Sequence, residues 1–283
     1  MLKIQQFYFR LVAWGRFYWN AVTKYQVHSP FVFQWITDVL EDQRHYYAFG
    51  AIDALRAKML ASNTPVQVLD YGAGPNAVLE NQQQPTQRNT TLKKIVQRAS
   101  SDHRQGEMLF KMADLYAPKY ILELGTSVGL GTLYIAQGGR SSAQFVSLEG
   151  CPNSAEIARL NLRTLGVKNV AIRAGSFEQN LKKAVQDMPQ LDFVYFDGNH
   201  QAAPTLSYFQ VCLDKVHKDS IFIWDDVHWS QGMENAWETI KKHEKVTLTI
   251  DCGHFACAFF NPDHKIKQHF QIVPSSWKPW KVF

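Results

Sequence analysis

The stretch Ile121-Leu-Glu-Leu-Gly-Thr-Ser-Val-Gly129 decides the fold, because it joins a short apolar strand to a glycine-rich turn that opens a helix. A strand, a tight turn and a helix in this order form one βα unit. The glycines let the backbone turn sharply and approach a ligand closely. Since a single glycine-rich loop is weak evidence for a binding site, its meaning depends on the rest of the chain.

Short apolar strands alternate with helical segments from Lys119 onward, which is typical of a mostly parallel sheet covered on both faces. The predicted strands are residues 120–124, 145–149, 170–174, 193–197, 221–225, 246–251 and 255–260. The intervening helices are predicted to begin near Gly131, Pro152, Phe177, Pro204 and Gln231. Only the last two strands are close enough in sequence for a hairpin. We therefore predict an α/β, Rossmann-like sheet of seven strands, with five parallel βα units and a terminal hairpin.

The flanking segments differ from this central part. Helices are predicted at residues 7–25, 30–40, 52–60 and 92–100, with Ser29 capping a helix that starts at Pro30. A second glycine-rich segment, Asp70 to Gly74, is followed by no strand ending in an acid, so we interpret it as a structural or substrate-side turn. The predicted organisation is a mainly helical N-terminal extension or cap (1–105), an α/β domain (106–262) and a C-terminal tail packed on it (263–283).

The composition limits which binding partners and which cellular compartment we expect. The net charge of +5 is not gathered in a run of Lys and Arg, so we do not expect a nucleic-acid substrate. The four cysteines include no CxxC pair, which favours reduced thiols and the cytoplasm. Residues 1–25 are aromatic but interrupted by charges, which argues against a transmembrane helix or a signal peptide. A packed helix, a lid and an interfacial membrane helix remain open for this segment.

A nucleoside site is predicted from a carboxylate that follows the loop. Glu149 ends the next strand, 18 residues after Gly131, where its carboxylate can accept both hydroxyls of a ribose, with Gly150 beside it. The loop spacing from Gly125 to Gly129 is wider than that of a pyrophosphate-binding loop, so we do not expect a dinucleotide. The pattern favours another nucleoside cofactor.

The loop residues suggest that this cofactor carries a methionine moiety. Glu123 suits its cationic amino group, and the hydroxyls and amides of Thr126 and Ser127 suit its carboxylate. The alternative is that Glu123 only anchors the loop. After the third strand, Ser176 and Phe177 are candidates for the edge and face of adenine, although Ser176 is equally suited to cap a helix.

Acidic and imidazole side chains follow two further strands. Asp197 and His200 come after the fourth strand, and Asp225, Asp226 and His228 come at the end of the fifth. The carboxyl ends of strands in an open α/β sheet line one crevice, so these groups are predicted to converge. A divalent cation, Mg²⁺ or another ion, would offset the clustered negative charge. The alternative without metal leaves His200 or His228 as general base, and we favour His200.

Residues 106–261, with these motifs, resemble class I S-adenosylmethionine-dependent methyltransferases, closest to the catechol and caffeoyl-CoA type O-methyltransferases. The resemblance implies ribose binding by Glu149 and metal binding by Asp197, Asp225 and Asp226. Where that family has a catalytic lysine, this chain has His200, which puts the metal and a catechol-type substrate in doubt. The whole chain also resembles a group of bacterial methyltransferases of unnamed substrate.

The predicted activity is S-adenosylmethionine-dependent O-methylation of a small molecule, with His200 and Asp197 as catalytic residues and metal assistance left open. A metal-independent N- or C-methyltransferase and a catalytically silent S-adenosylmethionine-binding protein are the alternatives. A homodimer is also left open.

Overall fold

The computed structural model describes residues 2–70, 86–98 and 102–281, and for residues 2–7 and Asp70 it describes the backbone only. The chain forms two compact units, each assembled from separate segments. Unit 1 contains residues 1–43, 194–196 and 200–283, and unit 2 contains residues 44–193 and 197–199. The short strand β6 (Phe193–Phe196) contributes to both. The boundaries predicted near residues 105 and 262 stay a prediction.

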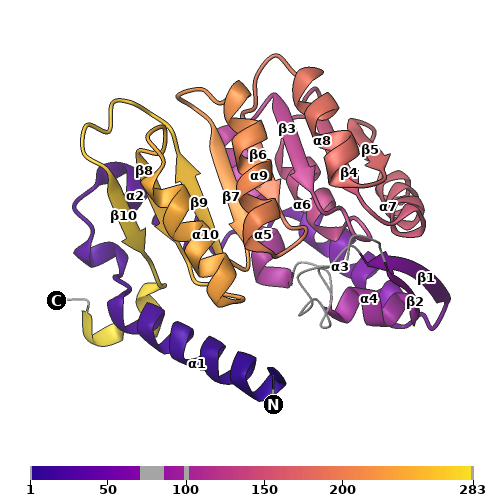
Figure 1. Cartoon of the computed structure of the whole chain (residues 1–283), viewed down its shortest axis with the longest axis horizontal. Coiled ribbons are helices and arrows are strands. Elements are labelled where there is room, and N and C mark those ends of the chain that lie inside the picture. The colour runs from indigo at the N-terminus through magenta and orange to yellow at the C-terminus, as the bar shows by residue number, and fades with distance from the viewer. Residues whose placement is uncertain (1, 71–85, 99–101, 282–283) are drawn as a thin grey trace. The chain divides into compact units, whose positions relative to one another are not determined.

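Unit 2 contains the glycine-rich loop and the strands around it (Figure 1). Its elements are α3 (Tyr47–Leu60), β1 (Pro65–Asp70), β2 (Thr86–Thr91), α4 (Leu92–Arg98), α5 (His103–Tyr116), β3 (Tyr120–Leu124), α6 (Leu130–Gly138), β4 (Gln144–Glu149), α7 (Pro152–Thr164), β5 (Val170–Ala174) and α8 (Phe177–Gln186). Strands β3, β4 and β5 pair in parallel in this order. Beyond the two ends of β6, Asp192 and Asp197 donate backbone hydrogen bonds to the carbonyls of Tyr120 and Leu124. Because β3, β4 and β5 are parallel, their carboxyl ends lie along one edge of the sheet.

Unit 1 contains the two chain ends and the second half of the sheet. Its elements are α1 (Leu2–Asn20), η1 (Lys24–Gln26), α2 (Pro30–Trp35), η2 (Ile36–Leu40), α9 (Ala202–Cys212), η3 (Leu213–Lys215), β7 (Ile221–Asp225), α10 (Gln231–Lys242), β8 (Leu248–Asp251), β9 (Phe255–Phe259), β10 (Gln268–Gln271), η4 (Ser275–Trp277) and η5 (Pro279–Lys281). The strand order is β10-β8-β9-β7-β6, with β9 antiparallel to both neighbours. Helices α9 and α10 lie side by side over these strands (Figure 1).

The predicted α/β fold with a mostly parallel sheet is confirmed, and the bounds of β3, β5 and β7 agree with the prediction. These strands were predictable because their apolar side chains are needed on both faces of a covered sheet. Helix α2 also begins where the sequence provides a cap. Ser29 accepts a hydrogen bond from the backbone N–H of Val32 at 3.4 Å, with Pro30 in the first helical position.

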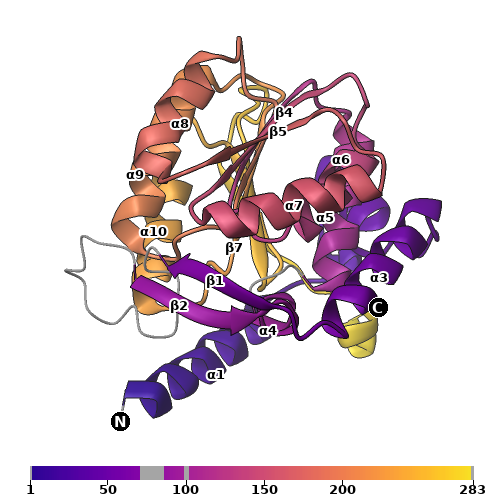
Figure 2. The same ribbon diagram turned by 90° about the vertical axis from the view of Figure 1, so that its right-hand side faces the viewer.

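The predicted count of seven strands in the main sheet was wrong, and a second, smaller sheet was not predicted. The main sheet has eight strands in the described residues, because β10 of the C-terminal tail pairs in parallel with β8. The N-terminal region also contains an antiparallel hairpin, β1–β2, which packs near α7 (Figure 2). Both additions are polar: β2 reads Thr-Gln-Arg-Asn-Thr-Thr and β10 reads Gln-His-Phe-Gln. The second glycine-rich segment, from Tyr71 to Gly74, lies outside the described residues.

The aromatic N-terminal segment is the part of the chain for which membrane contact was considered. Among the helices in the described ranges, none combines the length and the apolar character that crossing a bilayer requires.

Candidate functional site

The glycine-rich loop after β3 lies against two neighbouring strand ends. The backbone N–H groups of Gly125 and Thr126 both donate to the carbonyl of Leu148 in β4, at 2.9 and 3.2 Å. Gly125 has φ +111°, and a Cβ there would lie 2.3 Å from the backbone oxygen of Asp197. Only glycine meets both conditions, because any side chain would be strained and would overlap this backbone. Gly129 has φ +85° and caps α6. The loop backbone is thus held tightly against Leu148 and the backbone of Asp197.

Glu149 lies beside this loop, as predicted from its place at the end of β4. Its Oε2 accepts a hydrogen bond from the Ser127 N–H at 2.6 Å, and its Oε1 accepts one from the Cys151 N–H at 2.9 Å. Burial raises the pKa of Glu149 to about 7, although both backbone hydrogen bonds act to lower it. A carboxylate has about four acceptor sites, so each oxygen keeps one for a ligand hydroxyl. This geometry fits the two adjacent hydroxyls of a ribose.

Glu123 is placed differently, inside unit 2. The side chain is buried, and its Oε2 accepts hydrogen bonds from the hydroxyls of Thr132 at 2.6 Å and Ser147 at 2.5 Å. The Thr126 hydroxyl also bonds to Ser147, so the loop is tied to this interior network. Burial raises the pKa of Glu123 to about 7. These contacts favour the anchoring role that the sequence left open, while binding of an amino group stays a prediction.

The segment after β5 combines a helix cap with an aromatic contact. Ser176 caps α8 by accepting a hydrogen bond from the Gln179 N–H at 3.4 Å, which favours the capping role of its hydroxyl. The ring of Phe177 lies so close to Gly198 that a Cβ there would be 2.5 Å from it. Phe177 and the backbone after Asp197 are therefore neighbours within unit 2, at the same strand edge as Glu149.

A second group of neighbouring residues lies in unit 1. It contains His200 and Asp226, which were predicted as site residues, and Trp229, which was not. The His200 and Trp229 rings are 6.4 Å apart between centroids. Burial lowers the pKa of His200, and the charge of Asp226 acts against this by raising it. A lowered pKa favours a neutral imidazole near pH 7, which is the form that accepts a proton. This state is compatible with the general base predicted from the sequence.

Arg10 of α1 joins this group and was missed by sequence reasoning. Its guanidinium lies 3.2 Å from the ring centroid of Trp229, and its Nε donates to the Trp229 carbonyl at 3.4 Å. The charge of Asp226 raises the pKa of Arg10, against a larger lowering by burial. The two partners are 219 residues apart in sequence. No local pattern could have indicated this contact.

His228, the other histidine considered as a base, is held at both ring nitrogens. Nδ1 lies 2.9 Å from Glu234 Oε1, and Nε2 lies 2.9 Å from Asp251 Oδ2. Arg16 of α1 also donates to both oxygens of Glu234, at 2.7 and 2.6 Å. These carboxylates raise the pKa of His228 despite its burial. His228 therefore has a structural role in connecting α1, α10 and β8.

The residues predicted to bind a metal ion belong to different units, with Asp197 in unit 2 and Asp225 and Asp226 in unit 1. Asp226 has φ +52°, and its N–H donates to the His254 carbonyl at 2.8 Å. Within the described ranges, no group of three or more His, Cys, Asp or Glu side chains is arranged to hold a metal ion. Metal binding by Asp197, Asp225 and Asp226 therefore stays a prediction, and we derive no chemical step through a metal ion.

Three loops at strand ends share a feature of the backbone. Ser127, Asn199 and Asp226 follow β3, β6 and β7, and they have φ values of +50°, +57° and +52°. Residues with side chains rarely adopt this left-handed conformation. Two predicted site residues, Ser127 and Asp226, thus have a strained backbone conformation.

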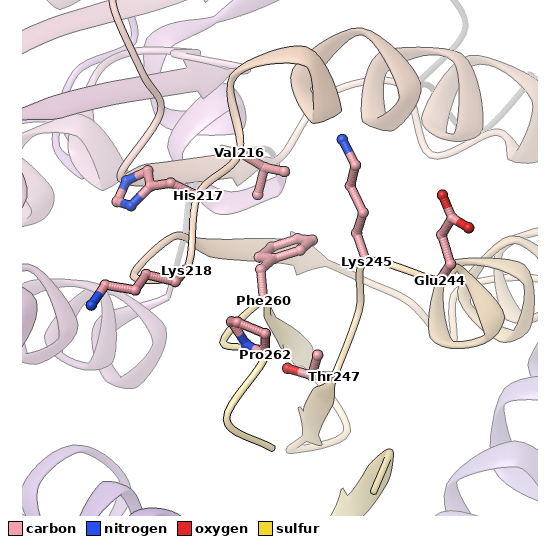
Figure 3. A pocket seen from close by; sticks show the side chains of 8 residues that line it. All are labelled: Val216, His217, Lys218, Glu244, Lys245, Thr247, Phe260 and Pro262. Atoms are coloured by element: carbon pink, nitrogen blue, oxygen red, sulfur yellow. The ribbon is translucent and has the colours of Figure 1, made fainter. Parts of the chain in front are cut away.

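A cavity of about 340 Å³ in unit 1 lies elsewhere (Figure 3). Its lining comes from segments before β7, before β8 and after β9, and the side chains are Val216, His217, Lys218, Glu244, Lys245, Thr247, Phe260 and Pro262. Because β9 is antiparallel to β7 and β8, these segments meet at the edge opposite Asp225. The cavity does not belong to the predicted site.

A comparison with protein families identifies the segment that carries the glycine-rich loop. A family model described as a methyltransferase domain matches residues 122–227. We refer to residues 122–227 as the methyltransferase domain, after the family that they match. The methyltransferase domain includes Glu123, Glu149 and Asp197, and it ends just after Asp226. The resemblance predicted from the sequence is confirmed.

Individual relatives agree with this assignment. The chain is similar to catechol O-methyltransferases of Mycobacterium tuberculosis, with 28% identity over 129 residues, and of Niastella koreensis, with 30% identity over 132 residues. Each match covers 44% of this chain and 55% or 56% of the relative, so the chain spans about half the length of the curated relatives it matches. An O-methyltransferase from Bacillus cereus, solved in complex with SAH, has a TM-score of 0.54 at 18% identity, covering 81% of this chain and 96% of that chain. This likeness shows that the methyltransferase domain has the same fold.

Proposed function

We propose that this chain is an S-adenosylmethionine-dependent methyltransferase that methylates an oxygen atom of a small molecule. The observation that carries the proposal is the contact between the glycine-rich loop and Glu149, in which the Ser127 N–H donates to Oε2 at 2.6 Å. This contact unites a loop that can approach a ligand with a carboxylate that suits a ribose. The methyltransferase domain covers both.

The residues that would hold the cofactor follow from this geometry. Glu149, with Gly150, would bind the ribose, and the loop from Gly125 to Gly129 would meet the methionine moiety through Ser127, while Thr126 anchors the loop through Ser147. Phe177 and Ser176 would border the adenine, with Asp197 close to the loop. The bound cofactor supplies a methyl group on a sulfonium. Binding both reactants in line would replace a bimolecular encounter and so supply much of the rate.

His200 would remove the proton from the acceptor hydroxyl. The support is its lowered pKa, which keeps the imidazole neutral and able to accept a proton near pH 7. Arg10 and Trp229 lie on the same side of unit 1 as this base and would contribute to its surroundings. The cytoplasm is the proposed location, because the four cysteines include no CxxC pair and three of them are buried.

Calorimetry with S-adenosylhomocysteine tests cofactor binding without turnover. Glu149→Ala should weaken binding at least about tenfold, since hydrogen bonds to a charged group contribute about 1.5 to 3 kcal/mol. Glu156→Ala, at an exposed position on α7, is the matched control and should bind like the wild type. Unaltered affinity in Glu149→Ala would refute the ribose assignment.

Mass spectrometry of reactions with S-adenosylmethionine and a panel of phenolic, amine and carbon acceptors tests the reaction. We expect a methyl ether, and comparing rates with and without EDTA tests metal assistance. A methylated amine or carbon would support the metal-independent alternative instead. Cofactor binding without methylation of any acceptor class would support a binding protein.

A further inference from the structure

The outward face of helix α1 is apolar, although it faces solvent. On its inner side, Ala13 and Phe17 are buried, and Phe17 packs with Val273. The opposite side presents residues 8, 11, 12, 15 and 19, which share one face of a helix. Tyr8 is 67% exposed, Leu11 is 57% exposed and Trp19 is 82% exposed. A helix packed on a globular protein usually places polar residues here, so this pattern needs an explanation.

The C-terminal segment extends the same surface. Tyr18 donates a hydrogen bond to the Trp277 carbonyl at 2.7 Å, and Lys278 Nζ donates to the carbonyls of Trp19 and Ala21 at 3.3 and 2.7 Å. Figure 1 shows the yellow C-terminal turns beside the end of α1. The next tryptophan, Trp280, is 66% exposed. We call the following exposed side chains the terminal face: Tyr8, Leu11, Val12, Trp14, Trp19 and Trp280.

The two segments that carry the terminal face contain no carboxylate side chain. The first acidic residue of the chain is Asp38, and the last is Asp263. The basic residues nearest the terminal face in sequence are Lys3, Arg10, Arg16, Lys24, Lys278 and Lys281. Arg16 and Lys24 are paired with Glu234 and Glu41 of other elements. Lys278 is buried, so it adds little charge to the surface, but the two segments that carry the terminal face have a positive net charge.

We propose that the terminal face binds the surface of a membrane that contains anionic lipids. Trp and Tyr favour the boundary between headgroups and acyl chains, where an amphipathic ring meets both environments. An amphipathic helix binds there through its apolar area and through attraction of basic residues to anionic headgroups. A second copy of the chain would bring two positively charged faces together, which the same charges oppose. The proposal goes beyond methyl transfer, because binding through the terminal face requires neither cofactor nor acceptor.

Cosedimentation of the full chain with vesicles tests this proposal. The probes are vesicles of phosphatidylcholine alone and vesicles of phosphatidylcholine and phosphatidylglycerol in equal amounts. We expect binding to the anionic vesicles only, and weaker binding at high salt, because the screening length falls from about 10 Å at 0.1 M to about 3 Å at 1 M.

Two leucines with the same exposure provide a matched pair of variants. Leu11 on α1 and Leu160 on α7 are both 57% exposed. Leu11→Gln should lower the vesicle partition coefficient roughly fivefold, since the leucine would be buried in the lipid interface. Leu160→Gln should leave it unchanged. Trp19→Gln should repeat the effect of Leu11→Gln, with circular dichroism confirming that each variant is folded.

Three results would overturn the proposal. The first is equal recovery of the protein in the pellet with and without anionic vesicles. The second is an equal loss of binding in Leu11→Gln and Leu160→Gln. The third is a dimer in light scattering that dissociates in Leu11→Gln, which would make a second copy the occupant. Calorimetry with S-adenosylhomocysteine on the same protein reports separately on the proposed function.

Discussion

Replacing Glu123 by Gln should remove a specific pH dependence of stability. In the folded protein, burial raises the pKa of Glu123 to about 7 from 4.5. Between these values the folded state holds a proton that the unfolded state has lost, so stability falls as the pH rises. Gln keeps the size of the side chain and an oxygen that can accept from Thr132 and Ser147, but it cannot ionise.

The magnitude follows from the two pKa values. At about 1.4 kcal/mol per pH unit, the difference corresponds to about 3 kcal/mol of stability that this carboxyl removes from the wild type above pH 7. The stability of Glu123→Gln relative to wild type should therefore increase by about 2.5 kcal/mol between about pH 5 and about pH 8, because a small part of the effect is already present at pH 5. Comparing the two pH values cancels the constant cost of placing an amide in the site.

Urea denaturation followed by circular dichroism provides the measurement. The control is Glu156→Gln, an exposed glutamate on α7, whose stability should parallel that of the wild type at both pH values. If Glu123→Gln differs from wild type by the same amount at both pH values, Glu123 does not titrate in this range and the reasoning is wrong. S-adenosylhomocysteine affinity in the same variant separates the two roles of Glu123: an anchor leaves affinity nearly unchanged, and an amino-group ligand weakens it.

Three further substitutions test other parts of the site. Gly125→Ala should lower the free energy of unfolding by about 2 to 4 kcal/mol, because its Cβ would lie 2.3 Å from the Asp197 backbone. Gly15→Ala is the control in the same urea titration, and it should cost no stability because a Cβ there has no neighbour within 4 Å. His200→Ala should lower turnover roughly 100-fold or more while S-adenosylhomocysteine affinity in calorimetry stays within about twofold, and unchanged turnover would exclude His200 from the mechanism. His228→Ala should cost about 3 kcal/mol in thermal or urea unfolding, because it leaves Glu234 and Asp251 close together without their shared partner. Because the pKa of His228 is raised, the stability that its protonation contributes is fully present below the ordinary pKa of histidine and disappears as the pH rises through the raised pKa. If His228→Ala loses more stability at alkaline pH than at acidic pH, this account is wrong.

The sequence predicted those elements whose burial forces an apolar pattern. Strands β3 and β7 are almost entirely buried, and their ends were placed correctly. Strands β2 and β10 were missed because their exposed, polar side chains carry no such pattern. Their pairing depends on backbone hydrogen bonds to partners that lie elsewhere in the chain.

Some contacts of the candidate site were predictable from the sequence, and others were not. Glu149 and the loop were predicted to meet because parallel strands bring their carboxyl ends to one edge. The role of Glu123 was left open because the sequence does not tell which face of the sheet its side chain occupies. Its two hydroxyl partners, Thr132 of α6 and Ser147 of β4, are known only from the structure. The contacts of Arg10 and Arg16 with residues more than 200 positions away depend on tertiary packing and have no local signal.

The left-handed turns at Ser127, Asn199 and Asp226 have a consequence for protein engineering. Each such residue costs about 1 kcal/mol or more, and glycine at the same position would relieve that cost. Selection for thermal stability alone should therefore favour glycine at these three positions. Such variants would melt at higher temperature yet lose the side chains and the rigidity of the loops that follow β3, β6 and β7. A library screened only for heat resistance would thus select against the side chains of the proposed site.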